Sequence, residues 1–175
     1  LHLRAGGNNL QNTFVGSGAG RFTLTGSKNT AYGFDALRAS ARGAYNTAIG
    51  AYSLRSINAG VDNTAHGYGA LYSLTTGNYN IGLGYQAGGT LTTGAHNVIL
   101  GYNINLPSTT SSNMLDIGNL IYATGLDGVG TSLSTGNVGV GDNAPLGKLT
   151  VAGHVHTSGT APTISACGTS PSTVT

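Results

Sequence analysis

Across residues 1–105, short apolar runs recur at a constant interval, and each run begins with an asparagine. The phrase NTAYGFDAL at Asn29–Leu37 returns as NTAIGAYSL at Asn46–Leu54 and as NTAHGYGAL at Asn63–Leu71. Asparagines spaced 17 residues apart, and glycines four residues after each, mark six copies without an insertion or deletion. These positions are Asn12, Asn29, Asn46, Asn63, Asn80 and Asn97, with Gly16, Gly33, Gly50, Gly67, Gly84 and Gly101.

The first half of each copy has the pattern of a strand. The residue after each asparagine is β-branched in all six copies, a type that favours strand. Two positions further lies a column of mostly larger residues, which shares the same strand face. It comprises Val15, Tyr32, Ile49, His66, Leu83 and Leu100. We therefore predict a four-residue strand in each copy, ended by the glycine.

The second half of each copy has a different spacing. Leu54 is followed by Ile57, and Leu71 by Leu74, and offsets of three and four are typical of a helix. The pattern predicts one short helical or 3₁₀ turn, with a wide bend as the alternative. A further glycine column is expected to hold the left-handed residue that ends this turn. Its members are Gly26, Gly43, Gly60, Gly77 and Gly94.

A unit of 17 residues buries its apolar side only by stacking on its neighbours. We therefore predict an all-β fold, a parallel β-solenoid or β-roll whose six coils span about 29 Å at a strand spacing of about 4.8 Å. The asparagines should form a ladder in which side-chain amides bond to the turn backbone and to one another. Because such a coil has a thin cross-section, we expect lateral association into a homotrimer.

The regular period is expected to fail after Gly101, which divides the chain into three parts. Residues 1–105 form the six-coil shaft, 106–145 a β-rich connector, and 146–175 a His-x-His strand with a tail rich in Ser, Thr, Pro and Gly. A hairpin is predicted around Gly118-Asn119. Further strands are predicted at Asn137–Val140 and Lys148–Val151.

Composition narrows the class of protein. Hydrophobic residues make up 39% of the chain and charged residues only 7%, and the formal net charge is +2. A charge this small argues against a nucleic-acid partner. No apolar run is long enough to span a membrane.

His154 and His156 are the strongest candidates for metal binding. Two histidines two residues apart on a strand point the same way. In a homotrimer, three copies would bring six imidazoles to the axis, a ligand set that suits iron or nickel. The alternative is two exposed polar residues at a strand edge, and the chain is expected to require no cofactor.

Arg21, Arg38 and Arg55 share one column and are expected to stack one coil apart. They form either a solvated stripe that limits edge-to-edge pairing or a contact for an anionic glycan or surface polymer. Asp35 and Asp62 fall in different columns, so they do not form the carboxylate pair of a glycosidase within one chain. Contact across a trimer seam stays open, but we expect no enzyme.

The motifs NTAIGAYSL, SSNMLDIGNLIYATG and GNVGVGDNAPLGKLTVAGHV resemble the stalks of phage tail-fibre and tailspike-like proteins that precede an endosialidase-type intramolecular chaperone. The repeat is also similar to the heads of trimeric autotransporter adhesins. This resemblance implies a homotrimeric fibre shaft or adhesin, extracellular or on the virion surface, that supports attachment to a cell-surface glycan or receptor. Two alternatives stay open: an end-to-end polymerising extracellular filament subunit, and a carbohydrate-active tailspike.

Overall fold

The computed structural model of the chain describes residues 3–5, 10–20, 25–128 and 132–153, which form a single sheet of 11 short strands. Each strand is three residues long, one shorter than predicted. The strands are β1 (Leu3–Ala5), β2 (Thr13–Val15), β3 (Thr30–Tyr32), β4 (Thr47–Ile49), β5 (Thr64–His66), β6 (Ile81–Leu83), β7 (Val98–Leu100), β8 (Leu115–Ile117), β9 (Ile121–Ala123), β10 (Val138–Val140) and β11 (Leu149–Val151).

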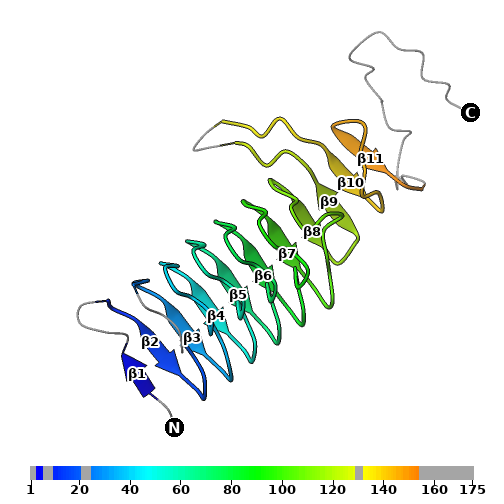
Figure 1. The fold of residues 1–175 in the computed structure, drawn as a ribbon. Helices are drawn as coiled ribbons and strands as arrows, with labels where there is room; N and C mark the ends of the chain where they lie inside the picture. Colours follow the sequence, from blue (N-terminus) through cyan, green and yellow to red (C-terminus); the bar gives the residue numbers. More distant parts are fainter. Residues whose placement is uncertain (1–2, 6–9, 21–24, 129–131, 154–175) are drawn as a thin grey trace, which may run out of the picture.

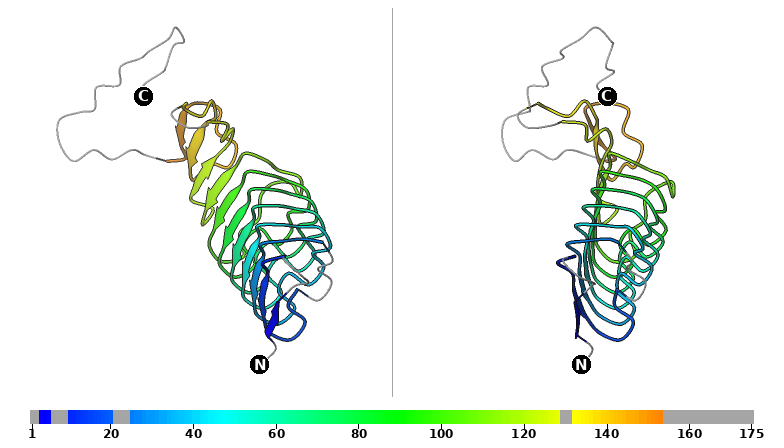
Figure 2. Two further views of the ribbon diagram at one scale, coloured as in Figure 1. Left: turned by 90° about the vertical axis from the view of Figure 1, so that its left-hand side faces the viewer. Right: turned by 60° about the vertical axis from the view of Figure 1, so that its left-hand side comes forward.

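Strands β2 to β8 are parallel and stack in chain order, so each coil of the chain adds one strand to the sheet (Figure 1). Thr47 pairs with Thr30 on one side and with Thr64 on the other, a step of one repeat each way. In both views of Figure 2 the strands lie along one side of flattened coils. This arrangement confirms the predicted all-β parallel solenoid.

The two ends of the sheet depart from the parallel pattern. β1 runs antiparallel to β2, while β8, β9 and β10 are successively antiparallel, and β11 is parallel to β10. The predicted hairpin around Gly118-Asn119 is confirmed by the pairing of β8 with β9. Strands β10 and β11 likewise confirm the two strands predicted near the C-terminal side.

The sheet carries the 17-residue step one coil further than predicted. Val98 pairs with Leu115, and Leu100 pairs with Ile117. The expectation that the period fails after Gly101 is therefore wrong for the backbone, because Met114 takes the asparagine position and its N–H still bonds to the Asn97 side chain at 3.1 Å.

The expected helical turn is wrong, because no helix occurs in the part of the chain that the structure describes. The spacing of three comes from tight turns, in which Ile57 N–H bonds to the carbonyl of Leu54 at 3.3 Å. The Leu54 N–H instead reaches across to Ala70 of the next coil at 3.0 Å. With Leu54 at φ 47°, in the left-handed region, the turn cannot continue as a right-handed helix.

The expectation that the second glycine column is left-handed is also wrong. Gly43 is absent from the positive-φ residues, and a Cβ there would lie 2.8 Å from the carbonyl oxygen of Gly60 and 3.0 Å from Nδ2 of Asn46. Glycine is needed because two backbones approach closely. The left-handed residue is the one before each asparagine, such as Tyr45 at φ 58°.

The core is thin, and its side chains are matched in size across the coil. In β2 to β5 the middle residue of the strand points inward, and the residue six positions later is buried in the same coil. Phe14 faces Gly20, since a Cβ on Gly20 would overlap the Phe14 ring, whereas Ala48 is matched with Leu54. In these four coils a large residue on one side goes with a small one on the other, which keeps the coil width constant. In the next coil both positions are glycine, and Leu71 and Ile99 of the adjoining coils fill the space.

In β2 to β8 the first and third residues of the strand point outward, and they become more apolar toward the C-terminal coils. In β2 to β5 the first position is threonine, but β6, β7 and β8 have Ile81, Val98 and Leu115 there. Ile81 and Leu83 are each 38% exposed, although both are large aliphatic residues. The outer sheet face, defined as these two outward columns, is therefore an exposed apolar surface on β6 to β8.

Candidate functional site

The asparagine column forms a buried polar ladder. Nδ2 of Asn63 donates to the carbonyl of Gly77 at 2.8 Å and to Oδ1 of Asn46 at 3.0 Å. Its own Oδ1 accepts from both the N–H and the Nδ2 of Asn80, at 3.0 Å each. Each amide thus satisfies buried backbone groups in its own coil and links two coils. The column holds the backbone together and is inaccessible to a ligand.

The first glycine column has a structural role as well. Gly50 has a φ of 122°, and a Cβ there would lie 2.6 Å from the carbonyl oxygen of Gly67 in the next coil. Both the conformation and the close approach require glycine. These positions end the strands and let adjacent coils touch, so they offer no side chain for chemistry.

Arg38 and Arg55 lie one above the other, with a carboxylate between them. Nε of Arg38 lies 3.6 Å from Oδ1 of Asp35, and Nε of Arg55 lies 3.7 Å from its Oδ2. Arg55 also donates to the Tyr72 hydroxyl at 3.0 Å. The third member of the predicted column, Arg21, lies outside the described residues. The described arginines are therefore not a free basic stripe, since Asp35 offsets part of their charge.

An aromatic row on the same side of the solenoid was missed by the sequence reasoning. It consists of Phe34, Tyr68, Tyr85 and Tyr102, each five residues after a repeat asparagine. The rings of Tyr68 and Tyr85 stack at 5.3 Å, and those of Tyr85 and Tyr102 at 5.1 Å. The 17-residue spacing of these aromatics was a signal that could have identified the row.

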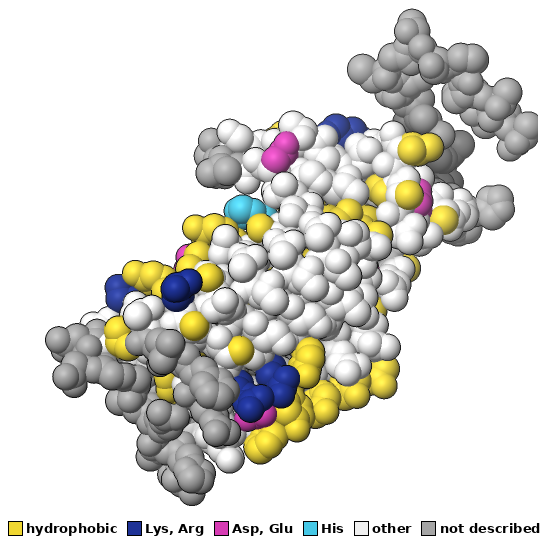
Figure 3. All heavy atoms as spheres, viewed as in Figure 1, with side chains coloured by type: hydrophobic (Ala, Val, Ile, Leu, Met, Phe, Trp, Pro, Cys, Tyr) yellow, Lys and Arg dark blue, Asp and Glu magenta, His cyan; other side chains and the backbone are white. Residues whose placement is uncertain are grey.

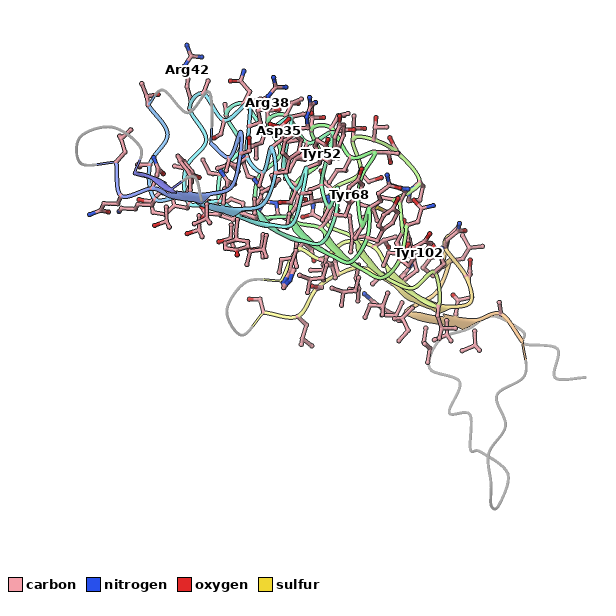
Figure 4. The ribbon with its side chains drawn as sticks, turned by 90° about the horizontal axis from the view of Figure 1, so that it is seen from below. Asp35, Arg38, Arg42, Tyr52, Tyr68 and Tyr102 are labelled. Carbon is pink, nitrogen blue, oxygen red and sulfur yellow. The ribbon has the colours of Figure 1, made fainter. Side chains whose placement is uncertain are left out.

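The aromatic row and the arginines adjoin one another along the shaft. Figure 4 shows the labelled Asp35, Arg38, Tyr52, Tyr68 and Tyr102 following one another along the long axis. In Figure 3, a dark-blue cluster of basic side chains with a magenta acidic one lies beside a row of hydrophobic side chains at the lower edge. The two groups therefore make one continuous surface.

A pocket of about 430 Å³ opens in this surface, between Tyr52, Tyr68 and Tyr72. The Arg55 guanidinium lies 5.9 Å from the ring centre of Tyr52 and 5.5 Å from that of Tyr72, within reach of cation–π attraction. Aromatic rings and a cation thus line the same opening, a combination suited to binding rather than to acid–base chemistry.

The histidines are not brought together by the described structure. His154 and His156 lie outside the described residues, so their proposed axial metal site stays a prediction. His66 is exposed at the end of β5, on the outer sheet face. Among the described residues, no group of three or more His, Cys or Asp side chains could hold a metal ion.

A second pocket, of about 310 Å³, lies beside the β8–β9 hairpin and is lined by two carboxylates, Asp116 and Asp142. Asp116 is only 2% exposed, and desolvation raises the pKa of its carboxyl although the Asn119 N–H hydrogen bond opposes this. Burial, with the nearby Asp116 charge, raises the pKa of Tyr122 to about 12. This pocket was not predicted, because the two carboxylates come together only through the pairing of β8 with β9 and of β9 with β10.

Both carboxylates also have structural partners in their own turns. Asp116 accepts the N–H of Asn119 at 2.9 Å, and Asp142 accepts the N–H of Ala144 at 2.9 Å. Short polar side chains commonly stabilise turns in this way. Each of the two carboxylates therefore stabilises the turn in which it lies.

Comparisons with known proteins give no family for this chain: it matches no protein-family model, no curated protein and no solved structure. The described part of the chain contains no helix with the length and apolar character needed to cross a membrane.

Proposed function

We propose that this chain is the shaft of an extracellular or virion-attached fibre, a rigid spacer that supports attachment to a cell-surface glycan or receptor. The observation that carries this proposal is the unbroken bonding between coils. Strands pair in register on one side, and N–H groups such as that of Leu71, bonded to Ala87 at 3.0 Å, link the coils on the other. The buried asparagines add a third line of bonds, which makes bending or shearing costly.

The shaft is proposed to be a homotrimer, in which the outer sheet faces of three chains meet. The exposed apolar residues of β6 to β8 support this, because large exposed apolar patches mark association sites. Because only 7% of the residues are charged, electrostatic repulsion between two copies of this Ile, Val and Leu surface is weak. Three copies would shield one another's outer sheet faces.

Native mass spectrometry of the purified chain tests this proposal. We expect a particle of three times the 17.5 kDa chain mass. Leu83→Asp, on the outer sheet face, should convert it to monomer, because three carboxylates would be buried near one another. Thr76→Asp is the matched control, since Thr76 is exposed but belongs to neither outward column.

A monomeric parent chain would contradict the trimer. Dissociation by both substitutions would show that the outer sheet face is not the specific interface.

A carbohydrate-active tailspike is a second candidate because one observation favours it. Asp116 and Asp142 line a single pocket, and the raised pKa of Asp116 is a property of general acids. Against this, Asp116 is 2% exposed, so a substrate has little access to its carboxyl. Release of reducing ends from a bacterial polysaccharide, lost in Asp142→Asn, would favour the tailspike over the shaft.

A further inference from the structure

A groove runs across several coils on the side of the shaft that carries the aromatic row. The pocket between Tyr52 and Tyr68 continues into a second hollow of about 140 Å³, which reaches Thr90 and Asn105. The two hollows share Gly69, Tyr72 and Gln86, so they are parts of one depression. Because the strands lie across the long axis, a groove that crosses coils runs along the shaft.

Gly69 creates this groove, and neither backbone conformation nor crowding explains why it is glycine. Its φ is 62°, but the equivalent positions in neighbouring coils take the same conformation with side chains, with Tyr52 at φ 60° and Gln86 at φ 51°. A Cβ on Gly69 would meet only the Gln86 Cγ, at 3.3 Å. The missing side chain therefore leaves a gap between Tyr52 and Gln86 of the adjoining coils, and that gap is the pocket.

The lining chemistry identifies the kind of occupant. The aromatic rings of Tyr52, Tyr68 and Tyr72 suit the C–H faces of sugar rings, which are weakly positive and are attracted to π-electrons. The amides of Gln86 and Asn105 donate to and accept from hydroxyl groups. Few other polymers offer apolar faces and hydroxyl edges in alternation, as a polysaccharide does.

Charge in the groove indicates an acidic sugar. Arg55 is the cation that lines it, and Asp35, which offsets part of that charge, is not among the lining residues. Lysine and arginine exceed aspartate over the whole chain, with a net charge of +2. A carboxylate on a bound sugar would pair with the Arg55 guanidinium through charge-assisted hydrogen bonds.

We propose that this groove binds a stretch of acidic polysaccharide laid along the shaft, with a sugar carboxylate at Arg55 and a sugar ring over the space left by Gly69. This binding site rests on the proposed fibre function, because a fibre outside the cell has access to such polymers. It lies laterally on the shaft itself.

Isothermal titration calorimetry of the full chain tests the proposal, with oligogalacturonate as the acidic probe and its methyl ester as the neutral counterpart. We expect the acidic probe to bind more tightly, with a preference that shrinks as salt rises. Gly69→Gln should weaken binding of both probes about tenfold or more, because it fills the groove with the side chain that the next coil has. Arg55→Gln should remove the preference for the acidic probe.

Tyr45→Asn is the matched control. Tyr45 is 51% exposed at the opposite ends of the strands, and asparagine tolerates its left-handed conformation. This variant should bind like the parent. Melting temperatures measured for all variants separate lost binding from lost folding.

A parent chain that binds neither probe, or a folded Gly69→Gln variant that binds as well as the parent, would overturn the groove proposal. The oligomeric state of the same samples is measured separately. A monomer that binds the probe would contradict only the trimer, and a trimer that binds neither probe would contradict only the groove.

Discussion

At the residue scale, the chain uses two polar side chains in buried positions for opposite effects. Asn63 is fully buried and its amide makes five hydrogen bonds in its own and neighbouring coils, so its burial is compensated. Asp116 occupies the inward position of β8, which is Ile99 in the coil before, and its carboxylate is desolvated. The amide stabilises the coil, whereas the charge on Asp116 destabilises it.

Asn63→Ala should lower the free energy of unfolding by about 2–4 kcal/mol, because it leaves the buried Gly77 carbonyl and Asn80 N–H without partners. Chemical denaturation monitored by circular dichroism measures this. Asn58→Ala is the control, since Asn58 is exposed and its loss should change stability little. Equal losses in the two variants would argue against the ladder as a source of stability.

Asp116→Asn should stabilise the chain at neutral pH while it keeps an oxygen to accept the Asn119 N–H. The folded pKa of Asp116 is raised above the unfolded value, so folding opposes its ionisation. The parent should therefore lose stability as pH rises from about 4 through the raised pKa. Melting temperatures of parent and variant should converge below about pH 3, where Asp116 is protonated in both states.

Asp62→Asn is the control for the substitution itself, and it should change the free energy of unfolding little because Asp62 is exposed. A variant that is less stable than the parent at pH 7 would show that the Asp116 charge is compensated in the fold.

At the element scale, the conformation of one coil depends on the sizes of its inward side chains and on the hydrogen bonds that its turns make. In β2 to β5 the middle position of the strand and the position six residues later hold one small and one large residue. In the β6 coil both are glycine, and side chains of the adjoining coils fill the space. Coil-to-coil bonds from the turn prevent a helix, although the leucine spacing suggests one. The leucine spacing gave a wrong prediction of a helix because the N–H groups of the turn bond to the neighbouring coil instead.

Gly82 and Leu71 lie in adjoining coils and give a direct test of size matching between them. A Cβ on Gly82 would lie 2.8 Å from the Cγ of Leu71. Gly82→Ala alone should cost about 1–3 kcal/mol by overpacking, and Leu71→Ala about 2–5 kcal/mol through a cavity. The loss of unfolding free energy in the double variant should be smaller than the sum of the two single losses by about 1 kcal/mol or more, because the new methyl group occupies part of the cavity.

Leu37→Ala is the matched partner for the control cycle, since three coils, or about 14 Å, separate it from Gly82. Its effect should add to that of Gly82→Ala within about 0.5 kcal/mol. Additivity in both cycles would show that Leu71 is not packed against position 82 of the adjoining coil.

At the scale of the whole molecule, the repeat makes length adjustable in units of one coil. Each coil contacts its two neighbours, and the pairing register is the same from β2 to β8. Stability in such a chain is close to a sum over coils and their interfaces. The shaft therefore tolerates loss of a complete coil and no fraction of one.

Deletion of residues 47–63 removes 17 residues and joins Asn46 to Thr64, so it should give a folded shaft shorter by one strand. Deletion of residues 47–62 removes one residue fewer and shifts every later column by one position. That shift turns inward side chains outward, and the chain should not fold cooperatively. Thermal unfolding and electron microscopy compare the two, and equal folding of both would contradict the register argument.

The amino-acid sequence by itself determined the all-β parallel solenoid, its 17-residue step, the β8–β9 hairpin and the asparagine column, because each is written in residue types at fixed spacing. Which residues face a shared space was decided only by the tertiary structure. The groove opened by Gly69, the ion pairs of Asp35 and the pocket of Asp116 depend on side chains one or more coils apart. Spacing along the chain identifies a column, but only the stacked coils show what lies beside it.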